Sequence, residues 1–193
     1  MQLGCSLPIG DIGTDPAVLR DYAQAAEGLG FTHLMAPDHV LGANPATYRG
    51  DRRVGTTASA YHDPFVLFGF LSGSTQRIGF AVGVLILAQR QAVLVAKQAA
   101  SLDVLSGGRF RLGIGVGWNE VEFVGLNENF HNRGRRSAEQ VRVMQRRKIG
   151  IGPFGMAGLI EQVLLAIKQL QPGAGFLAVE CVAALVDKAC ERG

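Results

Sequence analysis

The feature that most constrains this chain is a regular alternation of apolar, strand-like runs with helix-like segments. The strand-like runs cover residues 2–9, 31–36, 77–87 and 109–116. Helices are predicted between them, from Asp15-Pro16 to Gly30 and at residues 64–72 and 92–105. Strand and helix signals that alternate in this way are typical of βα units on a parallel sheet. The runs are continuously apolar, which indicates strands that are covered on both faces.

Composition favours a single α/β domain in the cytoplasm. The 193 residues are 48% hydrophobic and include 26 glycines but only 14 Phe, Tyr and Trp side chains (10, 3 and 1), which suits a turn-rich α/β protein better than a helical bundle. No apolar stretch reaches the ~18 residues of a membrane span. The three cysteines, Cys5, Cys181 and Cys190, have no metal-ligand spacing. We therefore expect a soluble, cytoplasmic protein with reduced thiols and no membrane partner.

The net charge of +3 is mild, and the positive charge is concentrated in a basic segment at residues 133–148, which leaves the rest of the chain near neutral or slightly acidic. This segment holds seven Arg or Lys side chains against one acid, Glu139. Such a cluster can contact phosphate or nucleic acid. It has no interleaved aromatic residues and no nucleic-acid motif, so a solvated helix face is the favoured interpretation. We expect no nucleic-acid partner.

The second strand-like run ends on an adjacent acid and imidazole, Asp38 and His39. In parallel α/β folds the loops at the carboxyl ends of strands carry the chemistry. A histidine there can exchange protons near neutral pH, and a neighbouring carboxylate can orient or polarise a ligand. The alternative is that Asp38 caps a turn and His39 is only a surface residue. From spacing alone the two interpretations stand equal.

The fourth run ends in GIGVG, residues 113–117, which raises a dinucleotide-binding interpretation. That motif needs a third glycine where Trp118 stands, so a Rossmann site is excluded. The small residues instead allow a flat ligand or a neighbouring strand to approach closely. Glu120 and Glu122 follow directly. Acids at the start of a helix are a commoner cause of such a pair than a metal site, so no metal is predicted.

Three collinear segments together resemble a known family. They are EGLGFTHLMAPDHV, IGFAVGVLILAQRQAVLVAKQAASLDVLSGGRFRLGIGVGW and NRGRRSAEQVRVM, which lie within residues 1–146. They are similar to the luciferase-like monooxygenase family, specifically to its coenzyme F420-dependent branch. The resemblance implies a TIM barrel and an oxidoreductase that transfers hydride between F420, or alternatively FMN, and a small organic substrate.

The resemblance also implies roles for individual residues. Asp38 is expected near the deazaflavin ring and His39 in proton transfer, and both are expected to be catalytic and to contact the cofactor. A bulged strand with a non-prolyl cis peptide is expected to support the ring. The further residues expected to contact the cofactor are Gly83, Val84, Gly115, Gly117 and Trp118.

The resemblance stops after Met144. Residues 147–193 contain no family motif and are predicted to form a mostly helical tail, so the predicted domains are 1–146 and 147–193. The fold class is therefore α/β, a partial TIM-type barrel of about four N-terminal βα units with a helical C-terminal tail. Four units cannot close an eight-stranded barrel alone. This leaves two functional classes open: an F420- or FMN-dependent oxidoreductase, and a catalytically silent truncated relative. A homodimer is hypothesised because a half-barrel exposes strand edges.

Overall fold

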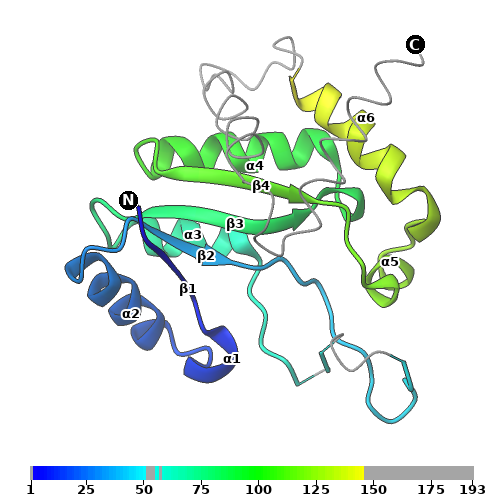
Figure 1. Ribbon diagram of the computed structural model, residues 1–193, viewed down its shortest axis with the longest axis horizontal. Coiled ribbons are helices and arrows are strands. Elements are labelled where there is room, and N and C mark those ends of the chain that lie inside the picture. Colours follow the sequence, from blue (N-terminus) through cyan, green and yellow to red (C-terminus); the bar gives the residue numbers. More distant parts are fainter. Residues whose placement is uncertain (1, 51–54, 57, 146–193) are drawn as a thin grey trace.

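The computed structural model describes residues 2–50, 55–56 and 58–145, and the predicted tail lies outside these ranges. Its centre is a parallel sheet of four strands in the order β1-β2-β3-β4. The strands are β1 (Gly4–Ser6), β2 (His33–Ala36), β3 (Gly79–Ile86) and β4 (Phe110–Gly115). Strand order follows chain order, and helices connect the strands, so the predicted α/β class with parallel βα units is confirmed (Figure 1).

Two of the four longer described helices begin at a capping residue that the sequence provides. The longer ones are α2 (Pro16–Gly28), α3 (Pro64–Ser72), α4 (Ala92–Leu105) and α6 (Arg133–Gln145). Asp15 caps α2 by accepting a hydrogen bond from the Ala17 N–H, and Asp63 caps α3 in the same way. Each of these caps precedes a proline at the first helical position, which is a favourable combination. The bounds of α3 and α4 coincide with the predicted residues 64–72 and 92–105.

Shorter elements complete the described chain. They are α1 (Ile9–Ile12), η2 (Leu87–Gln89), α5 (Glu120–Gly125) and η3 (Phe130–Asn132). The first strand was predicted too long, because the Pro8 carbonyl accepts hydrogen bonds from Asp11 and Ile12 and starts α1 inside the predicted run. No described helix is both long enough and apolar enough to cross a membrane.

The main core lies between the helices and one face of the sheet. Alternate strand residues on this face are buried, including Leu34 in β2, Phe80 in β3 and Phe110 in β4. Leu34 pairs in register with Phe80, which pairs with Phe110. On the other face His33 and Met35 are half-buried and Arg111 is exposed. Within the described residues, therefore, the strands are not covered on both faces, contrary to the prediction from their apolar runs.

Strand β3 is irregular where the site begins. Its register against β4 shifts between Val82 and Leu85, and the Gly83–Val84 peptide bond is cis, as the resemblance implied. Glycines of β4 face this irregularity. A Cβ on Gly113 would overlap the Val82 carbonyl oxygen, and a Cβ on Gly115 would overlap the Val84 side chain. Of the two uses left open for the glycine run, the structure shows the close approach of a neighbouring strand.

Candidate active site

Asp38, which lies two residues after the end of β2, is buried, with 2% of its surface exposed. Its carboxylate accepts a hydrogen bond from the Ile86 N–H at 3.0 Å and two from Arg90, at 2.6 Å from Nη2 and 3.2 Å from Nε. A buried carboxylate needs such partners, because an unpaired charge is costly to remove from water. Asp38 therefore joins the end of β2 to the end of β3.

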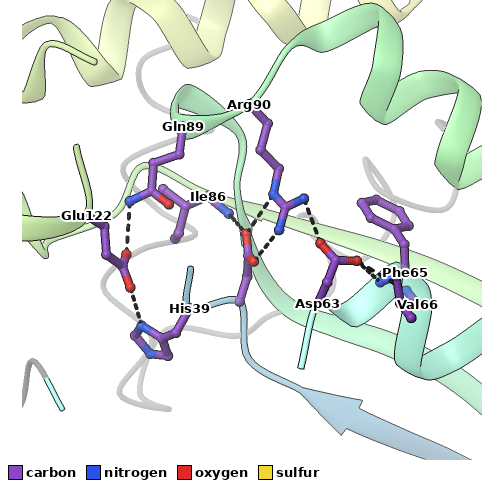
Figure 2. A network of polar contacts seen from close by, with 9 residues as sticks. His39, Asp63, Phe65, Val66, Ile86, Gln89, Arg90 and Glu122 are labelled. Atoms are coloured by element: carbon purple, nitrogen blue, oxygen red, sulfur yellow. Dashed lines mark hydrogen bonds and ion pairs between the residues drawn. The ribbon is translucent and has the colours of Figure 1, made fainter. Parts of the chain in front are cut away.

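Arg90 extends this link to two helices. Its Nη1 donates to the Asp63 carboxylate at 2.9 Å, so the residue that caps α3 is also an ion-pair partner (Figure 2). Its backbone carbonyl accepts a hydrogen bond from Gln140 of α6 at 2.7 Å. The guanidinium also lies 5.9 Å from the ring centroid of Phe65 in α3. Arg90 thus connects the segment after β2 and helix α3 through its side chain, and helix α6 through its backbone carbonyl.

His39 belongs to a second chain of polar contacts. Its Nδ1 lies 2.9 Å from Oε1 of Glu122, and Oε2 of the same carboxylate accepts a hydrogen bond from Gln89 Nε2 at 2.9 Å (Figure 2). Glu122 is in α5, on the side of the sheet toward which β4 points (Figure 1). Only 1% of the Glu122 side chain is exposed, against 21% of His39. The acid is therefore inside the protein and the imidazole reaches the surface.

The two ionisable partners stabilise each other's charged forms. The hydrogen bond that His39 donates to Glu122 raises the pKa of His39 above its ordinary 6.5, outweighing the opposite effect of burial. Burial alone would raise the pKa of Glu122, but the hydrogen bonds from His39 and Gln89 outweigh it and hold that pKa below the ordinary 4.5. Glu122 is then an ionised acceptor, so Nδ1 of His39 is the donor and Nε2 remains for another partner.

Two aromatic side chains stand around the imidazole. The Tyr61 ring centroid is 4.7 Å from that of His39 with a tilt of 44°, and the Trp118 centroid is 6.5 Å away, edge to face at 74°. Trp118 follows β4 and is 47% exposed. His39 and Trp118, which lie far apart in the sequence, are therefore brought together at the carboxyl edge of the sheet.

The other residues expected at the site lie nearby, and some of them pack against neighbouring strands and helices. Val84 is half-buried against a small cluster of Ile86, Ala88 and Phe123. Gly117 has a φ of 77° and packs against Ile86 and Phe123. Gly115 is buried, so only its backbone is available to a ligand. Gly83 is half-buried beside Met35 of β2.

Sequence reasoning missed Glu122, Gln89, Arg90 and Tyr61. Glu122 lies 83 residues from His39, and no local pattern predicts a contact across that separation. Its local signal pointed elsewhere: Asn119 followed three residues later by Glu122 is a helix-start pattern. Asn119 does cap α5 through the Val121 N–H, but Glu122 turns to His39 instead. Among the described residues no group of three His, Cys, Asp or Glu side chains could hold a metal ion.

Parallel βα units with an acid-imidazole contact at the carboxyl edge of the sheet are typical of α/β proteins whose chemistry lies at the strand ends. The comparison with protein families agrees with this class. Residues 1–147 match the family described as luciferase-like monooxygenase, and the chain belongs to that family.

Relatives of known sequence are considerably longer than this chain. An uncharacterized protein of Mycobacterium tuberculosis is 34% identical over 134 residues, which are 64% of this chain and 45% of the relative. The 4-hydroxyprotoasukamycin monooxygenase of Streptomyces nodosus subsp. asukaensis is 30% identical over 152 residues, 76% of this chain and 37% of the relative. The chain thus spans less than half the length of these curated relatives.

Solved structures show the same fold. Monooxygenase RslO1 from Streptomyces bottropensis superimposes with a TM-score of 0.61 at 21% identity, covering 76% of this chain and 42% of that chain. The oxygenating constituent of 3,6-diketocamphane monooxygenase from Pseudomonas putida, solved in complex with FMN, gives 0.57 at 18% identity, covering 76% and 39%. At these identities the likeness establishes the fold alone, and it supports the TIM-barrel-type βα architecture.

Proposed function

We propose that this chain acts as a flavin- or deazaflavin-dependent oxidoreductase on a small organic substrate, with His39 as the group that moves a proton. The observation that carries the proposal is the contact of His39 with the buried Glu122 at the carboxyl edge of the sheet. A partly exposed imidazole held by an internal carboxylate is a suitable general acid or base, because the carboxylate fixes its orientation and favours its protonated form.

The residues at this edge fit the ring of such a cofactor. Trp118 and His39 are accessible, and Val84, beside the cis peptide, is half-buried. The backbone at Gly83, Gly115 and Gly117 adds little bulk. When bound, F420 or FMN would supply the hydride chemistry, and the protein supplies orientation, a proton partner and exclusion of water.

The fit does not extend to the cofactor's phosphate-bearing tail. The cations described at this edge already have partners: Arg90 is paired with Asp38 and Asp63, and Arg133 donates to the carbonyls of Gly117 and Phe130. The proposal therefore assigns the ring to the described residues and leaves the tail without an assigned cation among them.

Each polar residue has a separate role in this proposal. His39 exchanges a proton at Nε2, because its Nδ1 is engaged by Glu122. Glu122 fixes the direction of the imidazole and favours its protonated form. Asp38 was expected to be catalytic and near the ring. Its carboxylate is committed to Arg90 and Ile86, so we assign it a positioning role: it fixes the backbone from which His39 projects.

The preference for F420 over FMN rests on the Asp38-His39 pair and the motifs shared with the F420-dependent branch. The FMN-bound 3,6-diketocamphane monooxygenase, which has the same fold, supports FMN as the alternative. The two cofactors have related tricyclic rings, so the proposal assigns either of them to the same edge of the sheet.

Separate titrations with F420 and FMN, followed by cofactor fluorescence, test the proposal. Saturable binding of one cofactor is expected, and His39→Ala should lower turnover of a responsive substrate by about 10²-fold or more, the usual contribution of a positioned proton donor. His131→Ala is the matched control, because His131 is exposed on η3, where its ring packs on Phe130. A folded sample that binds neither cofactor would identify the chain as a catalytically silent relative.

We also propose that two copies of the chain associate. β1 and β4 are the outer strands of the described sheet, and their outer edges have no strand partner among the described residues. Unpaired edges readily pair with another chain. Sedimentation at several concentrations tests this, and a compact monomer at all of them would rule it out.

A further inference from the structure

The loop between β2 and α3 forms a pocket beside the proposed proton donor. Six residues line it: Val40, Leu41, Gly42, Thr56, Ser59 and Tyr61. Val40 follows His39 directly, and the Tyr61 ring packs on the imidazole at 4.7 Å. Among the residues that the structure describes, the lining contains no Lys, Arg, Asp or Glu side chain. The described part of the pocket is thus next to His39 and is polar without being charged.

The walls of this pocket are held by contacts within the loop and with α5. The Ala43 N–H donates to the Gly55 carbonyl at 3.2 Å, and Ala43 forms a β-bridge with Thr56. A Cβ placed on Gly125 of α5 would lie 2.5 Å from a methyl carbon of Leu41, so these two residues pack closely. The pocket is therefore attached to the helix that carries Glu122.

Three hydroxyl groups give the pocket hydrogen-bond donors. The Ser59 Oγ accepts from the Thr56 N–H at 3.0 Å, and the Thr56 Oγ1 accepts from the Ala58 N–H at 3.2 Å. A hydroxyl that accepts from a backbone N–H still has its own proton to donate. These contacts fix the oxygen positions and leave the O–H groups able to bind an acceptor.

Two of the hydroxyls flank Gly55. A Cβ built on Gly55 would lie 3.1 Å from the Tyr61 hydroxyl oxygen and 3.2 Å from the Ser59 Oγ, so both oxygens lie beside this glycine. Gly55 has a φ of 75°, a conformation that disfavours any larger residue, so no side chain stands there. Two oxygens this close to one point of the backbone are near enough for a single acceptor in the pocket to receive a hydrogen bond from both.

We propose that this pocket binds the substrate of the reaction proposed above and selects an uncharged organic molecule whose acceptor oxygen, such as a carbonyl, lies between Ser59 and Tyr61. That the bound molecule is a substrate rests on the proposed function; that the pocket binds such a molecule does not. Val40 and Leu41 supply apolar contact to the body of the molecule. An ammonium or a carboxylate would lose hydration without meeting an opposite charge in the described lining, and His39 beside it is already paired with Glu122, so charged analogues are disfavoured.

Three ring compounds of similar size test the proposal: cyclohexanone, cyclohexanecarboxylate and cyclohexylammonium. Each is titrated into the ¹⁵N-labelled full chain without cofactor, and backbone amide shifts are followed. Cyclohexanone is expected to give saturable shifts at Gly42, Thr56 and Ser59, with the charged compounds at least about tenfold weaker. Ser59→Ala and Tyr61→Phe are each expected to weaken cyclohexanone binding about fivefold. Tyr48→Phe, which removes a hydroxyl elsewhere on the same loop, should change nothing.

The proposal is overturned by an absence of saturable shifts at these residues, by equal binding of the charged compounds, or by unchanged binding in both hydroxyl variants. Cofactor binding by the same samples is read independently from F420 or FMN fluorescence. If cyclohexanone does not bind the pocket but a cofactor binds the protein, the substrate site alone is refuted. A pocket that binds cyclohexanone in a protein without cofactor affinity refutes the proposed function and leaves a selective ligand site.

Discussion

Glu122 is a carboxylate with almost no exposed surface, and His39 is the ionisable group that contacts it directly. Because the two pKa values move apart, His39 upward and Glu122 downward, both groups carry charge over a common pH range. The same contact that orients the imidazole therefore also sets its protonation. At the scale of single residues, the chemistry of His39 depends on an acid that does not itself reach the surface.

Replacing this acid with its amide separates the two effects. Glu122→Gln keeps the shape of the side chain but removes its charge, so the pKa of His39 is expected to fall, as measured from its ring proton resonances. Turnover should fall by up to about 10²-fold, because the imidazole is both less protonated and less firmly oriented. Glu120→Gln is the matched control, since Glu120 is exposed on the same helix. An unchanged His39 pKa would contradict this role.

The same pair makes stability depend on pH. The folded-state pKa of His39 lies above 6.5, so its contribution is complete below pH 6.5 and is lost as the pH rises through that folded value. The folded-state pKa of Glu122 lies below 4.5, so its contribution is present above pH 4.5 and lost as the pH falls through its folded value. The difference in unfolding free energy between the wild type and Glu122→Gln should therefore be largest between about pH 4.5 and 6.5. Urea unfolding across pH 4 to 9 measures it, and a pH-independent difference would contradict the assignment.

At the scale of elements, β4 fits the irregular part of β3 because it has glycines there, at positions 113 and 115. β3 shifts its register between Val82 and Leu85, and the glycines of β4 lie where a normal strand would carry side chains toward that shift. The glycine run thus serves the packing of the two strands.

Gly113→Ala tests the match. The added methyl would overlap the Val82 carbonyl oxygen, a backbone atom that cannot move without shifting β3, so a loss of about 1–3 kcal/mol in unfolding free energy is expected. Gly69→Ala is the control: it lies in α3, its Cβ would meet nothing within 4 Å, and it should be neutral or stabilising by up to about 1 kcal/mol. Urea unfolding of both variants gives the comparison. Equal stability of Gly113→Ala and the wild type would show that β3 adjusts freely.

Elements were predicted best where local signals fix both ends. α3 and α4 match their predicted ranges, α3 because Asp63-Pro64 starts it and Gly73 follows it. Strand ends were less predictable, since an apolar residue can continue past the last ladder bond: Phe31 was assigned to the second strand, but its N–H bonds to Ala26 of α2. The position of the Asp38-His39 pair was predictable, whereas its partners Arg90 and Glu122 were not, because they depend on how distant units pack.

At the scale of the whole molecule, Arg90 connects parts that are far apart in the chain. It pairs with Asp38 after β2 and with Asp63 before α3, and its carbonyl is bound by Gln140 of α6. Its two carboxylate partners differ in exposure: none of the Asp38 side chain is exposed, against 34% of Asp63. Loss of the guanidinium would therefore destabilise the buried Asp38 carboxylate more than the partly exposed Asp63.

Arg90→Ala is expected to lower the unfolding free energy by about 3–5 kcal/mol, because it leaves the buried Asp38 carboxylate without its cation. Arg20→Ala is the matched control, since Arg20 pairs with Asp21 at an exposed position, where an ion pair contributes at most about 1 kcal/mol. Thermal or urea unfolding of the two variants checks the contrast. A small effect of Arg90→Ala would mean that water or another donor replaces the guanidinium at Asp38.

Trp118 stands edge to face with His39 and is the single tryptophan of the chain. Its near-ultraviolet emission overlaps the absorption of flavins and deazaflavins, and energy transfer is efficient over the width of such a site. A ring held at the strand ends would therefore quench the intrinsic emission of the protein without any label. Under the proposed function, the molecule would contain its own optical reporter of occupancy, placed beside His39.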